Sequence, residues 1–381
     1  MVLIPVLIVL LLTAHALLIE NYRRWFVKVK PFISSSDALP TVFFTVVIPA
    51  RNEEDQITDC LQSVLAQNYP QHLFEVIVAD DYSTDKTAVI IQNLQKQYLN
   101  LHLLQLENIL PDKQLNSYKK KAIELAIQQA KGNWIVTTDA DCTVSNNWLV
   151  NLNEFILKNN SVFVAAPVKI INAGSFISVF QCLDFMSLQG ITAASVYHRF
   201  HTMCNGANLA YDKSAFYEVN GFKGIDNIAS GDDMLLMHKI FVRYNERVHF
   251  LLSRDSIVET KPAKSVKEFI NQRIRWASKA DKFDDKRILG VLVFIYFFNL
   301  SFVVILIVEI WHKSLWIYWL AMIAAKTLIE LRFMVPVARF FKEEMLLWWF
   351  PLMQPFHIIY TIVAGWLGKF GKYSWKGRIV K

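Results

Sequence analysis

Apolar and polar positions alternate in blocks along the middle of the chain. Four short apolar runs predict buried strands: 41–50, 74–79, 101–106 and 134–138. Between them, apolar residues recur at helical spacing and predict three helices: 55–67, 84–97 and 118–131. Strands that alternate with helices indicate an α/β fold with a mostly parallel sheet.

Long apolar runs stand near both ends of the chain and predict membrane helices. Residues 2–19 lack Lys, Arg, Asp and Glu, and their length nearly matches a hydrocarbon core of about 30 Å. The basic run YRRWFVKVK follows, and such charges tend to stay on the cytoplasmic side. We therefore predict an uncleaved anchor over 1–22. The alternative is a signal peptide that ends near Ala14–His15–Ala16.

A membrane region of about three hydrophobic helices is predicted over 288–368, before a basic tail over 369–381. The three candidate segments are 288–308, 314–338 and 345–368. Charges interrupt the second, although Lys326 and Glu330 have the spacing of a helical ion pair, and the third holds two prolines. With an anchor and three further spans, the basic tail would lie outside the cytoplasm, whereas its positive charge favours the cytoplasmic side. We therefore expect one segment to be re-entrant or to lie in the interface.

Composition narrows the possible functions. Hydrophobic residues make up 54% of the chain and the mean hydropathy is positive, which is unusual for a soluble protein. The net charge of +7 fits membrane-flanking basic residues or an anionic substrate. No nucleic-acid partner is expected, because no basic face is interleaved with aromatic residues. The four cysteines lack metal-site spacing and are expected to be free thiols in a reducing compartment.

Carboxylates follow three of the four predicted strands. ARNEED follows the first strand, Asp80 and Asp81 end the second, and Asp139 and Asp141 follow the fourth. In a parallel sheet these positions share one edge, where ligands bind. If Asp139 and Asp141 continue the strand, their side chains point the same way and repel unless a cation such as Mg²⁺ or Mn²⁺ lies between them. The alternative is that Asp141 caps the following helix.

Five motifs resemble those of family-two glycosyltransferases, which have a GT-A fold. In chain order they are VVIPARNEE, VADDYSTDKT, TTDADC, SGDDMLLM and QRIRW, and together they span roughly 42–280. The layout with flanking membrane segments is similar to that of the synthase-type members, which include the cellulose, hyaluronan and ceramide-sugar enzymes. The resemblance implies a cytosolic GT-A domain over 41–285 that uses a nucleotide-sugar.

The resemblance also implies roles for individual residues on the donor side. Seven residues would contact the donor nucleotide, most simply a uridine nucleotide: Pro49, Arg51, Glu53, Asp80, Asp81, Lys120 and Asp139. Asp141, together with Asp139, would bind Mg²⁺ or Mn²⁺. A second interpretation of Lys120 is that it lies on a solvent-exposed helix face.

The catalytic residues implied by the resemblance are Asp232, Asp233 and Arg275, with Asp233 as the base; the family has Glu at the position of Asp232. The alternative is that both acids favour a helix start through its dipole, with Ser230 as the cap. Six residues would contact the diphosphate or the acceptor: Gly206, Asn208, Gln272, Arg273, Arg275 and Trp276. The last four lie in a basic amphipathic helix, predicted over 265–283 at the membrane surface.

Together these implications describe a membrane-bound inverting glycosyltransferase of the plasma (inner) membrane. It would move a sugar from a nucleotide-sugar to a membrane lipid or a lipid-linked glycan. Two alternatives stay open: a processive polysaccharide synthase, and a non-catalytic membrane scaffold with a degenerate transferase domain. The sequence leaves the sugar, the acceptor and the oligomeric state open.

Overall fold

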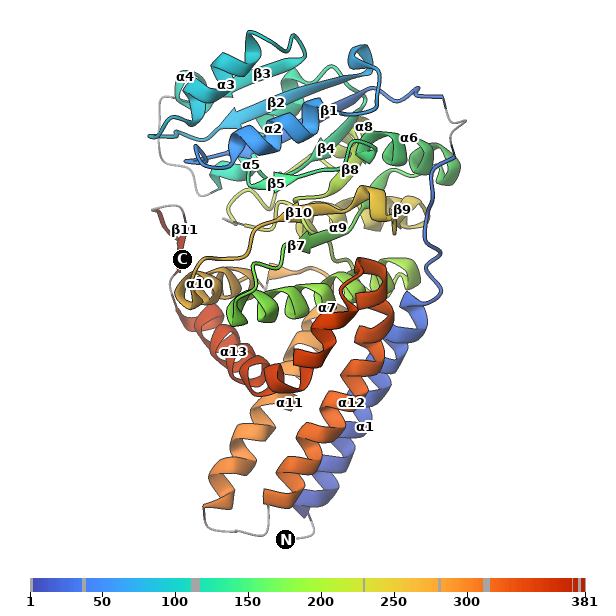
Figure 1. Cartoon of the computed structure of the whole chain (residues 1–381), viewed down its shortest axis with the longest axis vertical. Helices are drawn as coiled ribbons and strands as arrows, with labels where there is room; N and C mark the ends of the chain where they lie inside the picture. The colour runs from blue at the N-terminus through green and yellow to red at the C-terminus, as the bar shows by residue number, and fades with distance from the viewer. Residues whose placement is uncertain are drawn as a thin grey trace.

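The protein has a globular α/β unit above a stem of long helices (Figure 1). The computed structural model describes residues 3–35, 39–110, 117–228, 230–279, 282–310, 316–371, 373–375 and 378–380. The amino-terminal helix lies in the stem, and the chain then enters the globular unit before it returns to the stem. The two parts are therefore built from interleaved stretches of one chain.

A seven-stranded sheet forms the centre of the globular unit, in the order β3-β2-β1-β4-β8-β6-β9. The first four strands in this order are parallel and match the four predicted strands: β1 (Phe44–Ala50), β2 (Phe74–Asp80), β3 (Leu101–Gln105) and β4 (Trp134–Thr137). Residues of β1 and β2 are almost entirely buried without alternation, because helices cover both faces of the sheet. The sequence prediction of a mostly parallel α/β fold is confirmed.

The other half of the sheet was not predicted and consists of short strands: β6 (Phe163–Ala165), β8 (Leu209–Asp212) and β9 (Val248–Phe250). β8 runs antiparallel to both β4 and β6. A second, smaller sheet has three strands: β5 (Cys142–Thr143), β7 (Val168–Ile170) and β10 (Val258–Thr260).

Helices connect these strands, and the three predicted ones are present with tighter bounds: α2 (Ile57–Leu65), α3 (Thr87–Gln95) and α5 (Tyr118–Gln129). The other helices of this unit are α4 (Leu106–Ile109), α6 (Trp148–Asn159), α8 (Lys213–Glu218) and α9 (Met234–Tyr244). Three short 3-10 helices are η1 (Gln71–Leu73), η2 (Asn245–Arg247) and η3 (Arg254–Ser256).

Two helices lie between the sheets and the stem: α7 (Phe176–His198) and α10 (Val266–Ala277). The stem holds α1 (Leu3–Phe26), α11 (Lys286–Glu309) and α12 (Trp316–Phe341), which extend away from the globular unit (Figure 1). η6 (Glu344–Trp349) and α13 (Phe350–Phe370) turn back across the top of the stem, where α13 packs against α10. The terminal hairpin of β11 (Tyr373–Trp375) and β12 (Arg378–Val380) lies beside α10.

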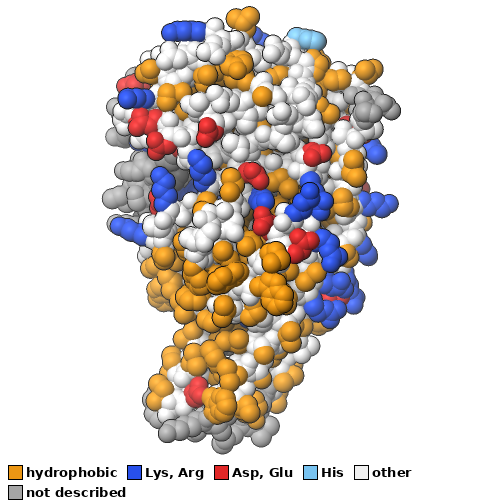
Figure 2. Space-filling view, viewed as in Figure 1, with side chains coloured by type: hydrophobic (Ala, Val, Ile, Leu, Met, Phe, Trp, Pro, Cys, Tyr) orange, Lys and Arg blue, Asp and Glu red, His pale blue; other side chains and the backbone are white. Residues whose placement is uncertain are grey.

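In the part of the chain that the structure describes, four helical stretches are long and apolar enough to cross a membrane: Val6–Phe26, Phe176–His198, Lys286–Glu309 and Glu344–Phe370. The second of them, α7, is mostly buried inside the protein, where it packs against α1 and α12. Hydrophobic side chains cover much of the stem surface, whereas charged side chains gather over the globular unit (Figure 2). This distribution is consistent with a membrane protein.

The charges inside α12 are compensated by neighbouring helices. Lys326 Nζ lies 2.8 Å from Glu330 Oε2, as the helical spacing predicted. His15 of α1 contacts the other oxygen of Glu330 at 3.0 Å, and Gln354 of α13 contacts both Lys326 and Glu330. These contacts tie α1, α12 and α13 together, and Tyr22 of α1 is buried in the core.

Candidate active site

A cavity of about 1130 Å³ lies between the loops of the globular unit and helices α7, α10, α11 and α13. The four acids predicted from the third and fourth motifs all line it: Asp139, Asp141, Asp232 and Asp233. The cavity continues from these acids to apolar residues of α11 and α13. One space therefore joins the acidic cluster to the helices of the stem.

Asp139 and Asp141 lie in a turn and not in a strand. β4 ends at Thr137, and the backbone N–H of Cys142 donates to the carbonyl oxygen of Asp139 at 3.1 Å. The prediction that strand alternation orients the two acids is therefore wrong; the turn brings both to the cavity. The helix-cap alternative for Asp141 is wrong too, since Asn147 is the N-cap residue of α6.

Asp233 forms the start of α9. Its carboxylate accepts from the backbone N–H of Met234 at 2.7 Å and from that of Gly206 at 3.2 Å. Asp233 is therefore the cap, and the predicted cap at Ser230 is wrong. These two bonds fix the orientation of the carboxylate at the wall of the cavity. Lys279, which the sequence did not single out, places its ammonium 3.8 Å from the same carboxylate.

Lys119 connects the two acidic loops. Its ammonium lies 2.7 Å from Asp139 Oδ1 and 3.4 Å from Asp232 Oδ2. Burial lowers the pKa of Lys119, but the charges of Asp139, Asp232 and Asp233 outweigh burial and raise that pKa above its ordinary value. Burial likewise disfavours the charged form of Asp232, yet the neighbouring lysines prevail and lower its pKa. Both groups are therefore charged at neutral pH.

Lys120 has neither of its two predicted environments. It is 2% exposed, so it does not lie on a solvent-exposed face, and it is not among the described residues that line the cavity. Its ammonium donates to the carbonyl oxygens of Ile225, Ile228 and Ser230, all within 2.9 Å. These bonds use its three donors, so Lys120 supports the loop before α9 and leaves no donor for a phosphate. Burial lowers the pKa of Lys120 to about 8.

The residues predicted to bind the nucleotide gather at the ends of β1 and β2: Pro49, Arg51, Glu53, Asp80 and Asp81. None of them is among the described residues that line the cavity, although β1 pairs with β4 on the same sheet. Arg51 donates to the carbonyl oxygens of Asp81 and Tyr82, which closes the two loops on each other. Burial raises the pKa of Asp80, and hydrogen bonds to Ser83 offset part of this effect.

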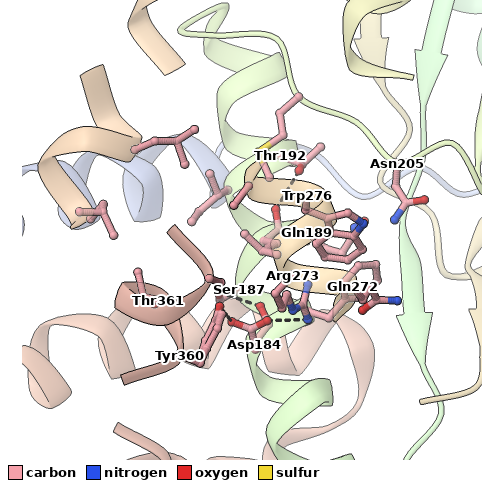
Figure 3. Close-up of a pocket in the computed structure, with 18 of the residues that line it drawn as sticks. Asp184, Ser187, Gln189, Thr192, Asn205, Gln272, Arg273, Trp276, Tyr360 and Thr361 are labelled. Atoms are coloured by element: carbon pink, nitrogen blue, oxygen red, sulfur yellow. Dashed lines mark hydrogen bonds and ion pairs between the residues drawn. The ribbon is translucent and has the colours of Figure 1, made fainter. Parts of the chain in front are cut away.

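Helix α10 presents three of its predicted residues to the cavity: Gln272, Arg275 and Trp276. The guanidinium of Arg275 has no ion pair or hydrogen bond with the part of the chain that the structure describes. Arg273 also reaches the cavity wall, but its guanidinium lies 2.6 Å from Asp184 of α7 and packs over the ring of Trp276 (Figure 3). A diphosphate role for Arg273 is therefore not supported; it joins α10 to α7.

Gly206 lines the cavity beside the acids, but Asn208 does not appear among its lining residues. Asn208 is 1% exposed, accepts from the indole N–H of Trp148, and donates to the carbonyl oxygens of Pro167 and Ser256. Its amide group is thus used inside the core, so the predicted contact of Asn208 with the diphosphate or the acceptor is not supported.

The acids fit a divalent cation that binds together with a phosphate. Across the described ranges, no group of three or more His, Cys, Asp or Glu residues could hold a metal ion by itself. Asp139 and Asp141 offer two carboxylates, and Mg²⁺ usually takes one or two carboxylates together with substrate phosphates and water. The donor set therefore suits a metal that is completed by a nucleotide diphosphate.

Comparisons with known proteins agree with this geometry. The model of "Glycosyl transferase family 2" matches residues 45–219, and that of "Glycosyl transferase family group 2" matches residues 134–367. A mannosyltransferase, PcManGT from Pyrobaculum calidifontis, solved with GDP-Man and Mn²⁺, has a similar structure with a TM-score of 0.58. It is 20% identical, and the match covers 94% of this chain and 98% of that one. This likeness shows the fold.

Relatives by sequence act on several glycans, according to their names. The poly(ribitol-phosphate) beta-N-acetylglucosaminyltransferase TarS of Staphylococcus aureus is 33% identical over 34% of this chain and 21% of its own. The poly-beta-1,6-N-acetyl-D-glucosamine synthase of Staphylococcus epidermidis is 26% identical over 68% of this chain and 61% of its own. The chain therefore spans less than two thirds of each of these relatives.

Proposed function

Because the chain belongs to glycosyl transferase family 2, we propose that it moves a sugar from a nucleotide-sugar, most simply a UDP-sugar, to a membrane lipid or lipid-linked glycan. Family membership confirms the predicted enzyme class and GT-A fold. The observation that carries the proposal is that one cavity is lined by the four acids and Arg275 and also by apolar residues of the stem helices.

On the donor side, Pro49, Arg51, Glu53, Asp80 and Asp81 would form the nucleotide site at the ends of β1 and β2. Asp139 and Asp141 would hold Mg²⁺ or Mn²⁺, which when bound supplies Lewis-acid stabilisation of the diphosphate. The Mn²⁺ named with the mannosyltransferase structure supports this choice. Arg275 lines the cavity without a partner among the described residues and would neutralise negative charge that grows on the departing diphosphate.

On the acceptor side, Asp233 would take the proton from the attacking hydroxyl. The acceptor oxygen then bonds to the anomeric carbon while the bond from that carbon to the diphosphate breaks, and the configuration inverts. The N–H groups of Met234 and Gly206 hold the Asp233 carboxylate in place for this step. This single displacement needs no covalent intermediate. Asp232 would contribute indirectly, through the ammonium of Lys119, which also contacts Asp139.

Three membrane crossings, by α1, α11 and α12, would place the basic tail on the side that its charge favours. α12 is not one of the four apolar stretches, but the pairing of Lys326 with Glu330 would compensate two of its charges. The chain would then return to the side of the globular unit before η6, and α13 would lie at the interface against α10. The tail over 369–381 would share that side, in agreement with its positive charge. Because nucleotide-sugars are cytosolic, the domain over 41–285 would face the cytosol from the plasma (inner) membrane, anchored by 1–22 and 288–368.

The polymer-forming alternative draws support from the synthase of Staphylococcus epidermidis. Extrusion of a polymer needs a channel, and three crossing helices supply few walls for one, so we favour the transfer of one or a few sugars. A degenerate scaffold would be expected to lose site acids. This chain retains four acids around one cavity, which disfavours the scaffold alternative.

A screen of nucleotide-sugars tests the proposal. Calorimetry on the full-length protein in detergent should find one UDP-sugar, or GDP-mannose as the second class to try, that binds with Mn²⁺ and not with EDTA. Metal-dependent binding is expected because the carboxylates of Asp139 and Asp141 would repel the diphosphate unless a cation lies between them. If no nucleotide-sugar bound to the folded protein in the presence of either Mn²⁺ or Mg²⁺, the proposal would be wrong.

A further inference from the structure

The stem end of the cavity has one apolar wall and one polar wall. The apolar wall belongs to α11: Ile288, Leu289, Leu292, Val293, Phe297 and Leu300. The polar wall belongs to α7, α10 and α13: Asp184, Gln189, Gln272, Arg273, His357 and Tyr360. Figure 3 labels all of these except His357. A ligand that fills this end must therefore be amphipathic.

The charges of the polar wall are already balanced within the protein. Asp184 lies 2.6 Å from Arg273 and accepts a hydrogen bond from the hydroxyl of Tyr360. Behind the wall, Glu330 is paired with Lys326. An ionic ligand at this wall would therefore meet charges that are already paired, whereas Arg275, which also lines the cavity, has no ion pair with the described residues.

Several buried polar atoms near this end have no hydrogen-bond partner within the described stretches. They are His15 Nδ1, Gln272 Oε1, Asn299 Oδ1, His357 Nδ1, and the Nε and Nη1 atoms of Arg273, whose Nη2 atom is paired with Asp184. A buried polar atom of this kind lowers stability unless a partner arrives. The set mixes donors and acceptors. Hydroxyl groups both donate and accept, but a phosphate group offers almost only acceptors and would oppose the amide oxygens of Gln272 and Asn299.

We propose that this end of the cavity binds the uncharged, hydroxyl-rich head group of a lipid, such as a sugar on a diacylglycerol, with its hydrocarbon chains along α11. The proposal rests on the proposed function and narrows its acceptor to a neutral glycolipid or polyol lipid. Asn299 is the most informative residue, because it is 1% exposed, lines the cavity, and uses its amide N–H group on its own helix while its oxygen has no partner.

Photolabelling in nanodiscs tests the head-group preference. The probes are a glucosyl diacylglycerol with a diazirine in one acyl chain and phosphatidic acid with the same chains. Mass spectrometry should find the glucosyl probe on peptides of α11 about tenfold more than the phosphate probe, a ratio that corresponds to roughly 1.4 kcal/mol. Equal labelling, or stronger labelling by phosphatidic acid, would overturn the proposal in favour of a lipid phosphate or a non-selective apolar groove.

Asn299→Leu separates binding from structure. The substitution keeps the branched shape and the number of heavy atoms and removes the unpartnered oxygen, so the melting temperature should stay the same or rise while labelling by the glucosyl probe falls about tenfold. Val304→Leu, at an exposed position of the same helix, should change neither quantity. Unchanged labelling in Asn299→Leu would refute the role of this wall. The assay needs no donor, so it can fail while nucleotide-sugar binding stands.

Discussion

Asp233→Asn is expected to lower turnover by about 10²–10⁴-fold while nucleotide-sugar binding persists. The asparagine oxygen can still accept from the backbone N–H of Met234, so the start of α9 should survive, but an amide cannot take the proton of the attacking hydroxyl. A radiolabelled-sugar assay measures the first quantity and calorimetry the second.

Asp212→Asn is the matched control for that substitution. Asp212 also caps a helix, since its carboxylate accepts from the N–H of Ala215 at 2.9 Å, but it lies outside the residues that line the cavity. The control should keep normal turnover. Normal turnover in Asp233→Asn itself would defeat the assignment of the base.

Asp141→Ala is expected to weaken metal-dependent nucleotide-sugar binding by about 100-fold or more, since a lost carboxylate ligand removes several kcal/mol of metal-mediated stabilisation. The carboxylate also accepts a hydrogen bond from the thiol of Cys142 at 3.5 Å, so the melting temperature of the variant serves as the control for its fold. Calorimetric titrations with Mn²⁺ and with EDTA measure the effect.

Asp255→Ala provides the comparison for the metal ligand. Asp255 is an exposed acid on η3 and does not line the cavity. Its removal should leave binding unchanged. If Asp141→Ala bound the donor as tightly as the unchanged protein in Mn²⁺, the metal site would have to lie elsewhere.

The first half of the sheet was predictable because its strands are buried on both faces and give uninterrupted apolar runs. The second half was not, since β6, β8 and β9 are only three or four residues long and leave no comparable run. The long helices were predictable from length and composition. That α13 lies across the stem depends on its packing against α10 and α7, and local composition does not encode that packing.

Asp139 and Asp141 were found because they follow a strand, and Asp232 and Asp233 through the family resemblance, but the correct lysine was not found. Lys119, Lys120 and Lys121 are consecutive, and successive helical residues point about 100° apart, so only one of the three can face the acids and the residue types alone did not show which. Asp184 was missed, although a lone acid inside the apolar run of α7 was a usable signal. Asn208 was misassigned because a short motif does not show to which side of the chain the residue before β8 points its side chain.

The most direct measurement is sugar transfer by the full-length protein in nanodiscs that contain a total membrane lipid extract. With the nucleotide-sugar that binds in the screen and Mn²⁺, radiolabel should move into lipids whose mass increases by one or a few sugars. Label that entered only a high-molecular-weight polymer, or was released only as free sugar, would contradict the account.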